Sequence, residues 1–155
     1  MGCVIPGLKR IGYNLKEEWV AKSIKWLTER QNRNGGFGET TLSYNNPDLY
    51  NGVGVSTVSQ TAWALLALID AMDVYDVQEE VDRAVSFLLS EFKRLGDRFF
   101  DISVVGTGHR GVLYLQYPSY AFSFPLIALS RYRARFANSS SNTTLVEPEA
   151  IKGFL

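Results

Sequence analysis

The 155-residue sequence predicts an all-α protein in which outer and inner helices alternate in concentric layers. Three observations predict this fold class. Segments with a single apolar stripe alternate with segments that are apolar around most of their circumference. Glycine-rich turns separate the segments, and one unit of helix, glycine turn and aromatic ring recurs later in the chain. No strand is evident from the sequence.

The first predicted helix begins after Leu15 and continues to Gln31. It carries Val20, Ile24 and Leu27 on a single stripe, which is typical of an amphipathic outer helix. The sequence NRNGG ends this helix. A loop of about twenty residues follows, which is long enough to be either functional or packed by its own aromatic side chains.

The second and third predicted helices differ in how their apolar residues are distributed. Ser56 or Thr57 can cap the second, STVSQTAWALLALIDAM, which is apolar on nearly all sides and is therefore predicted to be an inner helix. Asp76 and Glu79 match a D-x-x-E capping box at the start of the third. The third is predicted to be an outer helix because it has one apolar stripe, formed by Val81, Ala84, Val85, Leu88 and Phe92.

The fourth predicted helix begins near Pro118, continues to about Phe136, and is again apolar nearly all round. Pro125 removes one interior hydrogen bond and is expected to bend this helix. Residues 137–155 are polar and lack periodicity, so we expect a disordered tail after a domain that spans residues 1–136.

Composition excludes several classes of function. The chain has 16 basic and 16 acidic residues, a balance that indicates no nucleic-acid partner. Its single cysteine, Cys3, excludes an internal disulfide and a multi-cysteine zinc cluster. It has no secretory signal pattern and no apolar run of the roughly 18 residues that a spanning helix needs. We expect a cytoplasmic protein, with a peripheral position on a membrane as the alternative.

The repeated unit follows a recognisable plan. KSIKWLTERQNRNGGFGE, from Lys22, and RAVSFLLSEFKRLGDRFFD, from Arg83, share a basic residue, a small residue, an aromatic residue before Leu, a linker, a glycine and a ring. This plan resembles the QW motif of the triterpene cyclases. The first copy fills the motif with Lys22, Ser23, Trp26, Leu27, Gln31, Gly35 and Phe37, where Phe37 replaces the usual Trp.

Three further blocks resemble the C-terminal part of bacterial squalene-hopene cyclases in order and spacing: GGFGETTLSYNNPDL, STVSQTAWALLALIDA and GTGHRGVLYLQYPSYAFSFPLIALSRY. The resemblance implies part of the α/α barrel, or toroid, of a class II terpene cyclase. Such an isomerase protonates a terminal alkene of squalene and steers the carbocation through ring closures. The resemblance also implies structural roles for Gln31 and Phe37, the amide bonding to the start of a neighbouring helix and the ring stacking beside it.

The family's cavity positions fall on Trp63, His109, Leu113, Tyr117 and Tyr120. Aromatic faces suit a carbocation because they offer negative potential without a nucleophile. The two tyrosines match the family, but His109 and Leu113 stand where it has phenylalanine, and His109 could quench or repel a cation. Ordinary core packing is the other interpretation of both tyrosines and of Trp63.

The family's proton donor lies in a D-x-D-D motif, and no such motif occurs in this sequence. Asp70 and Asp73 lie near a helix end and are expected to be solvated or capping groups, not acids. We therefore assign no catalytic residue and do not expect the chain alone to start the reaction. It would act on squalene or a related isoprenoid only when an upstream cyclase half, or self-association, completes the barrel.

Two other functional classes fit parts of the sequence. One is a non-catalytic helical module that binds protein or lipid. The other is a prenyltransferase β-subunit, but this would need a zinc site from Asp, Cys and His, for which only Cys3 and His109 are available. We expect neither a metal nor a cofactor.

Overall fold

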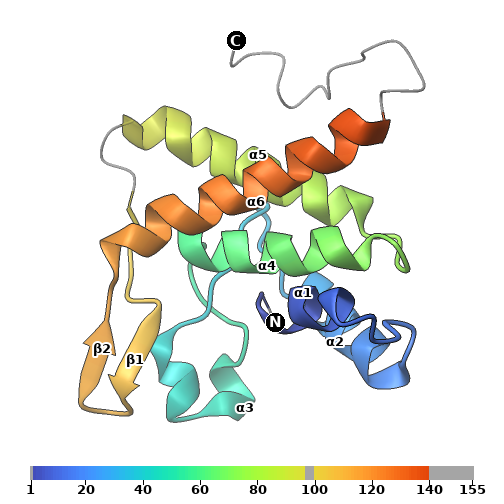
Figure 1. The fold of residues 1–155 in the computed structure, drawn as a ribbon. Coiled ribbons are helices and arrows are strands. Elements are labelled where there is room, and N and C mark those ends of the chain that lie inside the picture. The colour runs from blue at the N-terminus through green and yellow to red at the C-terminus, as the bar shows by residue number, and fades with distance from the viewer. Residues whose placement is uncertain (1, 97–99, 140–155) are drawn as a thin grey trace.

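The computed structural model describes residues 2–96 and 100–139, and its elements are almost all helices (Figure 1). They are α1 (Val4–Arg10), α2 (Glu18–Thr28), the 3-10 turn η1 (Thr41–Tyr44), α3 (Pro47–Tyr50), α4 (Val58–Ala71), α5 (Gln78–Leu95), β1 (Gly106–His109), β2 (Leu113–Leu115) and α6 (Pro118–Ser139). The predicted all-α class is confirmed. The expectation that strands are absent is corrected by the β1–β2 hairpin, which is too short for an alternating pattern to be visible in the sequence.

Helix α4 lies at the centre of the structure. Every residue of α4 except Gln60, Trp63 and Asp70 is buried, and the helix contacts α1, α2, α5 and α6. Its predicted inner position is therefore confirmed. The predicted cap is also confirmed, because the Thr57 side chain accepts a hydrogen bond from the backbone N–H of Gln60 at 3.2 Å.

Helices α2 and α5 each bury one stripe, as predicted. In α2 the buried residues are Val20, Ile24 and Leu27. In α5 the stripe packs against α4 and also includes Phe87. The predicted capping box of α5 is wrong: the helix begins at Gln78, Val77 is its N-cap, and no side chain caps it. Val77 is buried at the N-cap position, and Asp76 therefore lies one residue too early to cap the helix.

The N-terminal segment and the loop before α4 contain short helices that periodicity did not reveal. Helix α1 buries only Ile5 and Pro6, which is too little to form a stripe. In the loop, Asn46 caps α3, and the backbone N–H of Thr40 donates to the carbonyl of Val53 at 2.9 Å. A Cβ at Gly38 would overlap the carbonyl of Val55, so glycine is what allows the two arms of the loop to approach.

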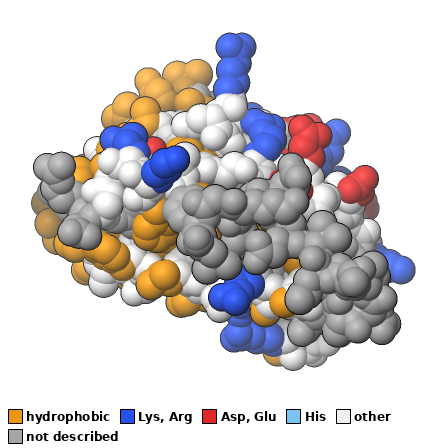
Figure 2. Space-filling model, turned by 90° about the horizontal axis from the view of Figure 1, so that it is seen from above, with side chains coloured by type: hydrophobic (Ala, Val, Ile, Leu, Met, Phe, Trp, Pro, Cys, Tyr) orange, Lys and Arg blue, Asp and Glu red, His pale blue; other side chains and the backbone are white. Residues whose placement is uncertain are grey.

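Helix α6 packs against α4, which lies below it in Figure 1, and has two different faces. It begins at Pro118 as expected and ends at Ser139. Ala128 and Tyr132 are buried against the core, whereas Phe122, Leu126 and Ile127 are exposed. Figure 2 shows hydrophobic side chains gathered on the left of the molecule, the side on which Figure 1 places the hairpin and the start of α6. Of the predicted tail, 137–155, residues 137–139 belong to α6, and residues 140–155 lie outside the described residues.

An ion-pair network joins α1, α4 and α6. Lys9 contacts Asp70 at 3.3 Å and Asp73 at 2.6 Å, while Arg131 contacts Asp70 at 3.2 Å and Arg135 contacts Asp73 at 2.7 Å. Lys9, and then Arg135, lower the pKa of Asp73 below its usual value by favouring the carboxylate. Asp73 is exposed, as expected of a solvated group, whereas Asp70 is half-buried, and both form ion pairs with cations of α1 and α6.

None of the helices in residues 2–96 and 100–139 combines the length and the apolar character needed to cross a lipid bilayer.

Candidate functional site

Four aromatic rings from α4 and the start of α6 form a cluster, which we call the aromatic cluster: Trp63, Tyr117, Tyr120 and Phe124. The ring centroid of Trp63 lies 5.9 Å from that of Tyr120 and 5.5 Å from that of Phe124, both edge-on. The Tyr120 ring lies 5.3 Å from Phe124, again edge-on, and 4.8 Å from Tyr117. Edge-to-face contacts of this kind are favourable because the positive edge of one ring meets the negative face of another.

Local structure explains why these rings meet. Tyr120 and Phe124 are four residues apart on α6 and therefore share a face, and Tyr117 precedes the helix by one residue. Trp63 projects from α4 on the side that α6 covers. Tyr117 is 44% exposed, and Tyr120 is half-buried. The cluster thus leaves part of both tyrosine rings accessible.

The hairpin carries the other two predicted cavity residues. His109 on β1 pairs with Leu113 on β2, next to an irregularity in register after Thr107. Both side chains are exposed, Leu113 by 51%, and His109 Nδ1 lies 3.1 Å from the carbonyl oxygen of Arg110. The structure therefore brings Trp63, Tyr117 and Tyr120 together and places His109 and Leu113 apart from them. Phe124, the fourth ring, was not singled out from the sequence.

Asp101 is a second residue that sequence reasoning missed. It is only 2% exposed, and its carboxylate accepts from the backbone N–H of Ser59 at 3.0 Å and from the Ser59 hydroxyl at 2.5 Å. The carboxylate thus caps the N-terminus of α4, where the helix dipole favours a negative charge. The Asp101 carbonyl also accepts from the Gln116 side chain. Through these hydrogen bonds, Asp101 connects the start of α4 to the chain just before the hairpin and, through Gln116, to the chain just after it.

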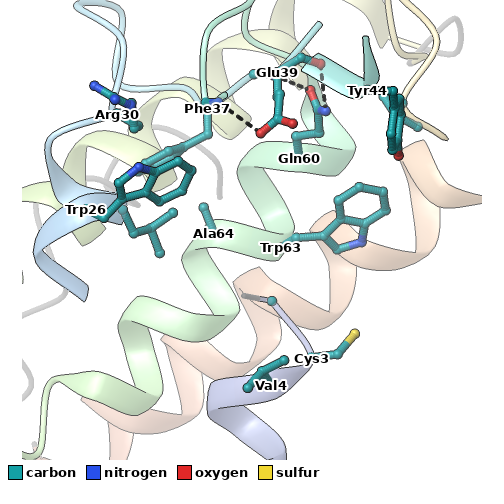
Figure 3. A pocket seen from close by; sticks show the side chains of 15 residues that line it. Cys3, Val4, Trp26, Arg30, Phe37, Glu39, Tyr44, Gln60, Trp63 and Ala64 are labelled. Carbon is teal, nitrogen blue, oxygen red and sulfur yellow. Dashed lines mark hydrogen bonds between the residues drawn. The ribbon is translucent and has the colours of Figure 1, made fainter. Parts of the chain in front are cut away.

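A cavity of about 480 Å³ lies between the start of the chain, α2, the loop before α4 and α4 itself (Figure 3). We call it the Glu39 cavity. Its aromatic lining residues are Trp26, Phe37, Tyr44 and Trp63, and Glu39 and Arg30 are its charged ones. Trp63 is thus shared between this cavity and the aromatic cluster. The other four predicted cavity residues, His109, Leu113, Tyr117 and Tyr120, do not line it.

The turn after α2 joins three helices. Gln31 Nε2 donates to the carbonyls of Gly35 at 2.9 Å and of Glu80, in the first turn of α5, at 2.8 Å. Gly35 has a φ of 84°, and a Cβ there would lie 2.4 Å from the Arg83 carbonyl oxygen. The backbone N–H of the buried Phe37 donates to Thr61 Oγ1 of α4 at 2.8 Å.

Two further residues of this repeat, Lys22 and Trp26, lie nearer the surface. Lys22 forms an ion pair with Glu18 on α2. The Trp26 ring centroid lies 5.6 Å from the guanidinium of Arg30.

In the part of the chain that the structure describes, no three His, Cys, Asp or Glu side chains are grouped so that they could hold a metal ion.

Comparison with known proteins gives a consistent family. The model of the squalene-hopene cyclase C-terminal domain matches residues 1–134. Squalene-tetrahymanol cyclase from Tetrahymena thermophila is 58% identical over 103 residues, which cover 64% of this chain and 15% of that protein. Dammaradiene synthase from Dryopteris crassirhizoma is 39% identical over 135 residues, covering 79% and 19%. Squalene-hopene cyclase from Bradyrhizobium diazoefficiens is 38% identical over 132 residues, covering 84% and 19%. The chain thus spans 15–19% of the length of these curated relatives.

Proposed function

The chain belongs to the family of the squalene-hopene cyclase C-terminal domain, and from this membership we propose that it supplies one wall of the reaction cavity of a triterpene cyclase. It corresponds to the C-terminal portion of such an enzyme. The substrate class we propose is squalene or a related isoprenoid, which agrees with the names of the relatives.

The observation that carries this proposal is the aromatic cluster. A carbocation next to a carboxylate would be captured, whereas a ring face stabilises the cation and cannot bond to it. Each desolvated cation–π contact contributes roughly 2 kcal/mol, which corresponds to more than a tenfold change in rate if it acts at a transition state. The partial exposure of Tyr117 and Tyr120 leaves part of each ring accessible, which supports a role beyond core packing.

The reaction needs a proton donor and a cover for the cavity, and another segment has to supply both. The sequence has no D-x-D-D motif, so another segment has to protonate the alkene. The apolar side chains of α6 and the hairpin, among them Leu126 at 60% exposure, have to be covered before the cavity can exclude water. We propose that the preceding part of a cyclase chain, or a second copy, provides the cover.

Complementation tests this function directly. The upstream four fifths of the Bradyrhizobium squalene-hopene cyclase would be produced with this chain, supplied with squalene, and the products separated by gas chromatography. We expect no turnover by either part alone and cyclised products from the mixture. Tyr120→Leu should lower product formation at least tenfold, while Tyr50→Leu, in the loop before α4, should not. Equal product formation by both variants would contradict the assignment.

The exposed apolar surface also favours a second candidate, a non-catalytic module that binds protein or lipid. Such a module would be a monodisperse, cooperatively unfolding monomer when isolated. Static light scattering combined with urea unfolding distinguishes it from a cyclase fragment, which should associate.

A further inference from the structure

The Glu39 cavity has mainly aromatic and aliphatic walls. Trp26 of α2 and Trp63 of α4 stand on either side of Ala64, and Phe37 and Tyr44 extend the lining above them (Figure 3). Both tryptophans are half-buried, so part of each ring is available to a ligand. A volume of about 480 Å³ lies within the range of sites that bind small molecules.

Glu39 brings a negative charge to this apolar space. Its Oε2 accepts a hydrogen bond from the backbone N–H of Gly52 at 3.0 Å, which fixes the carboxylate. Its Oε1 makes no hydrogen bond, and no Lys or Arg among the described residues forms an ion pair with it. The other polar side chain nearby, Gln60, hydrogen-bonds to the backbone N–H and carbonyl of Glu39 and accepts from the Thr57 hydroxyl.

Arg30 lines the same cavity but does not neutralise Glu39. Its guanidinium packs on the Trp26 ring and points away from Glu39 (Figure 3). This contact also shows that a ring of the cavity wall already interacts with a cation. The cavity therefore combines several ring faces with a carboxylate that forms no ion pair with any Lys or Arg of the described chain, although Arg30 also lines the cavity.

We propose that the Glu39 cavity binds an organic cation of the quaternary or tertiary alkylammonium class. Alkyl groups make such a cation weakly hydrated, so it can leave water and pack against Trp26, Tyr44 and Trp63 while Glu39 supplies the opposite charge. An anion would be repelled by Glu39, and a neutral molecule of the same shape would gain nothing from it. This inference does not rest on the proposed cyclase role, because it needs neither a partner segment nor a reaction.

A matched pair of ligands tests the inference on the full 155-residue chain. Choline and 3,3-dimethylbutan-1-ol have the same shape and differ in charge. Titration calorimetry and tryptophan fluorescence should give at least tenfold tighter binding of choline, and this preference should shrink as salt is added. Equal affinities for the two ligands, or no saturable binding of choline, would overturn the proposal.

Variants with opposite expected effects separate charge recognition from loss of fold. Glu39→Gln can still accept from Gly52 and should weaken choline binding about tenfold while leaving dimethylbutanol unchanged. Arg30→Gln removes a positive charge and should strengthen choline binding. Glu79→Gln, on the exposed side of α5, is the matched control and should have no effect.

A second variant covers the case in which Glu39→Gln destabilises the loop. Trp63→Phe keeps an apolar wall but has a weaker ring face, so choline affinity should fall severalfold with circular dichroism unchanged. Loss of both ligands to the same extent in either folded variant would show that the cavity recognises shape alone and would refute the charge-based inference.

Discussion

At the residue scale, Tyr132 joins α6 to α5 through one buried hydroxyl. The side chain is 3% exposed, and its hydroxyl donates to Asp82 Oδ1 at 2.9 Å. Gln78 Nε2 donates to the same oxygen at 2.9 Å. Burial, and then the adjacent Asp82 carboxylate, raise the pKa of Tyr132 above its usual value, because a phenolate there would lose hydration and meet a like charge.

This raised pKa predicts a loss of stability in alkali. The unfolded chain releases the Tyr132 proton near pH 10, whereas the folded chain keeps it, so this residue's contribution is complete below about pH 10 and falls as the pH rises further. Tyr132→Phe should lower the free energy of unfolding by about 1–2 kcal/mol at pH 7 and should flatten its decline above pH 10. Urea unfolding at pH 7, 9 and 10.5 measures both effects.

The control for this prediction is Tyr44→Phe, since Tyr44 is exposed and should leave both the stability and its alkaline slope unchanged. If Tyr132→Phe declined above pH 10 as steeply as the parent chain, the buried hydroxyl would not be the cause.

Residue-scale contacts show what the sequence could predict of the site. The sequence pointed to Trp63, Tyr117 and Tyr120, and the ring of Tyr120 contacts the rings of the other two in the structure. Phe124 could have been found as well, because it follows Tyr120 by four residues on one helix. Tyr132 and Asp82 are 50 residues apart, so no local pattern could have predicted their pairing.

At the element scale, α4 was the most predictable part of the fold and the hairpin the least. Apolar residues on nearly every side of α4 predicted a buried helix, and α4 is buried among α1, α2, α5 and α6. The hairpin depends instead on long-range hydrogen bonds. The Asp101 carboxylate accepts from Ser59, 42 residues earlier, and the Gln116 side chain donates to the Asp101 carbonyl. Such long-range hydrogen bonds leave no periodic signal in the sequence.

Asp101 should therefore stabilise both α4 and the aromatic cluster. Asp101→Ala leaves the backbone N–H and hydroxyl of Ser59 buried without an acceptor and should cost about 1–3 kcal/mol of unfolding free energy. Because the Gln116 contact precedes Tyr117, the environment of Trp63 should change as well, seen as a shift of tryptophan emission. Urea unfolding followed by fluorescence reports both.

Asp76→Ala is the matched control, because Asp76 is an exposed acidic residue that lies before the α5 cap and makes no capping bond. It should change stability by less than about 0.5 kcal/mol. Equal losses in the two variants would mean that Asp101 acts only through its charge.

At the scale of the whole molecule, polar and apolar contacts are unevenly distributed. The ion pairs of Lys9, Arg131 and Arg135 with Asp70 and Asp73 draw α1, α4 and α6 together. The first half of α6 presents Leu126 and Ile127 to solvent. The sequence indicated this imbalance, because a helix that is apolar all round requires neighbours on every side, and the described chain provides them on one side only.

This exposed face predicts that the isolated chain associates through α6. Replacing both Leu126 and Ile127 with Gln should convert an associating chain into a monomer, because it removes apolar area that water otherwise contacts. The same change should alter the unfolding midpoint little, since both side chains are exposed in the folded chain. Sedimentation equilibrium over a range of protein concentrations measures the association.

The control is Arg133→Gln, an exposed position on the same helix, which should leave the association of the parent chain unchanged. A parent chain that stays monomeric at every concentration would mean that this face needs no partner, and the cover proposed for the cyclase cavity would have to be sought on another surface.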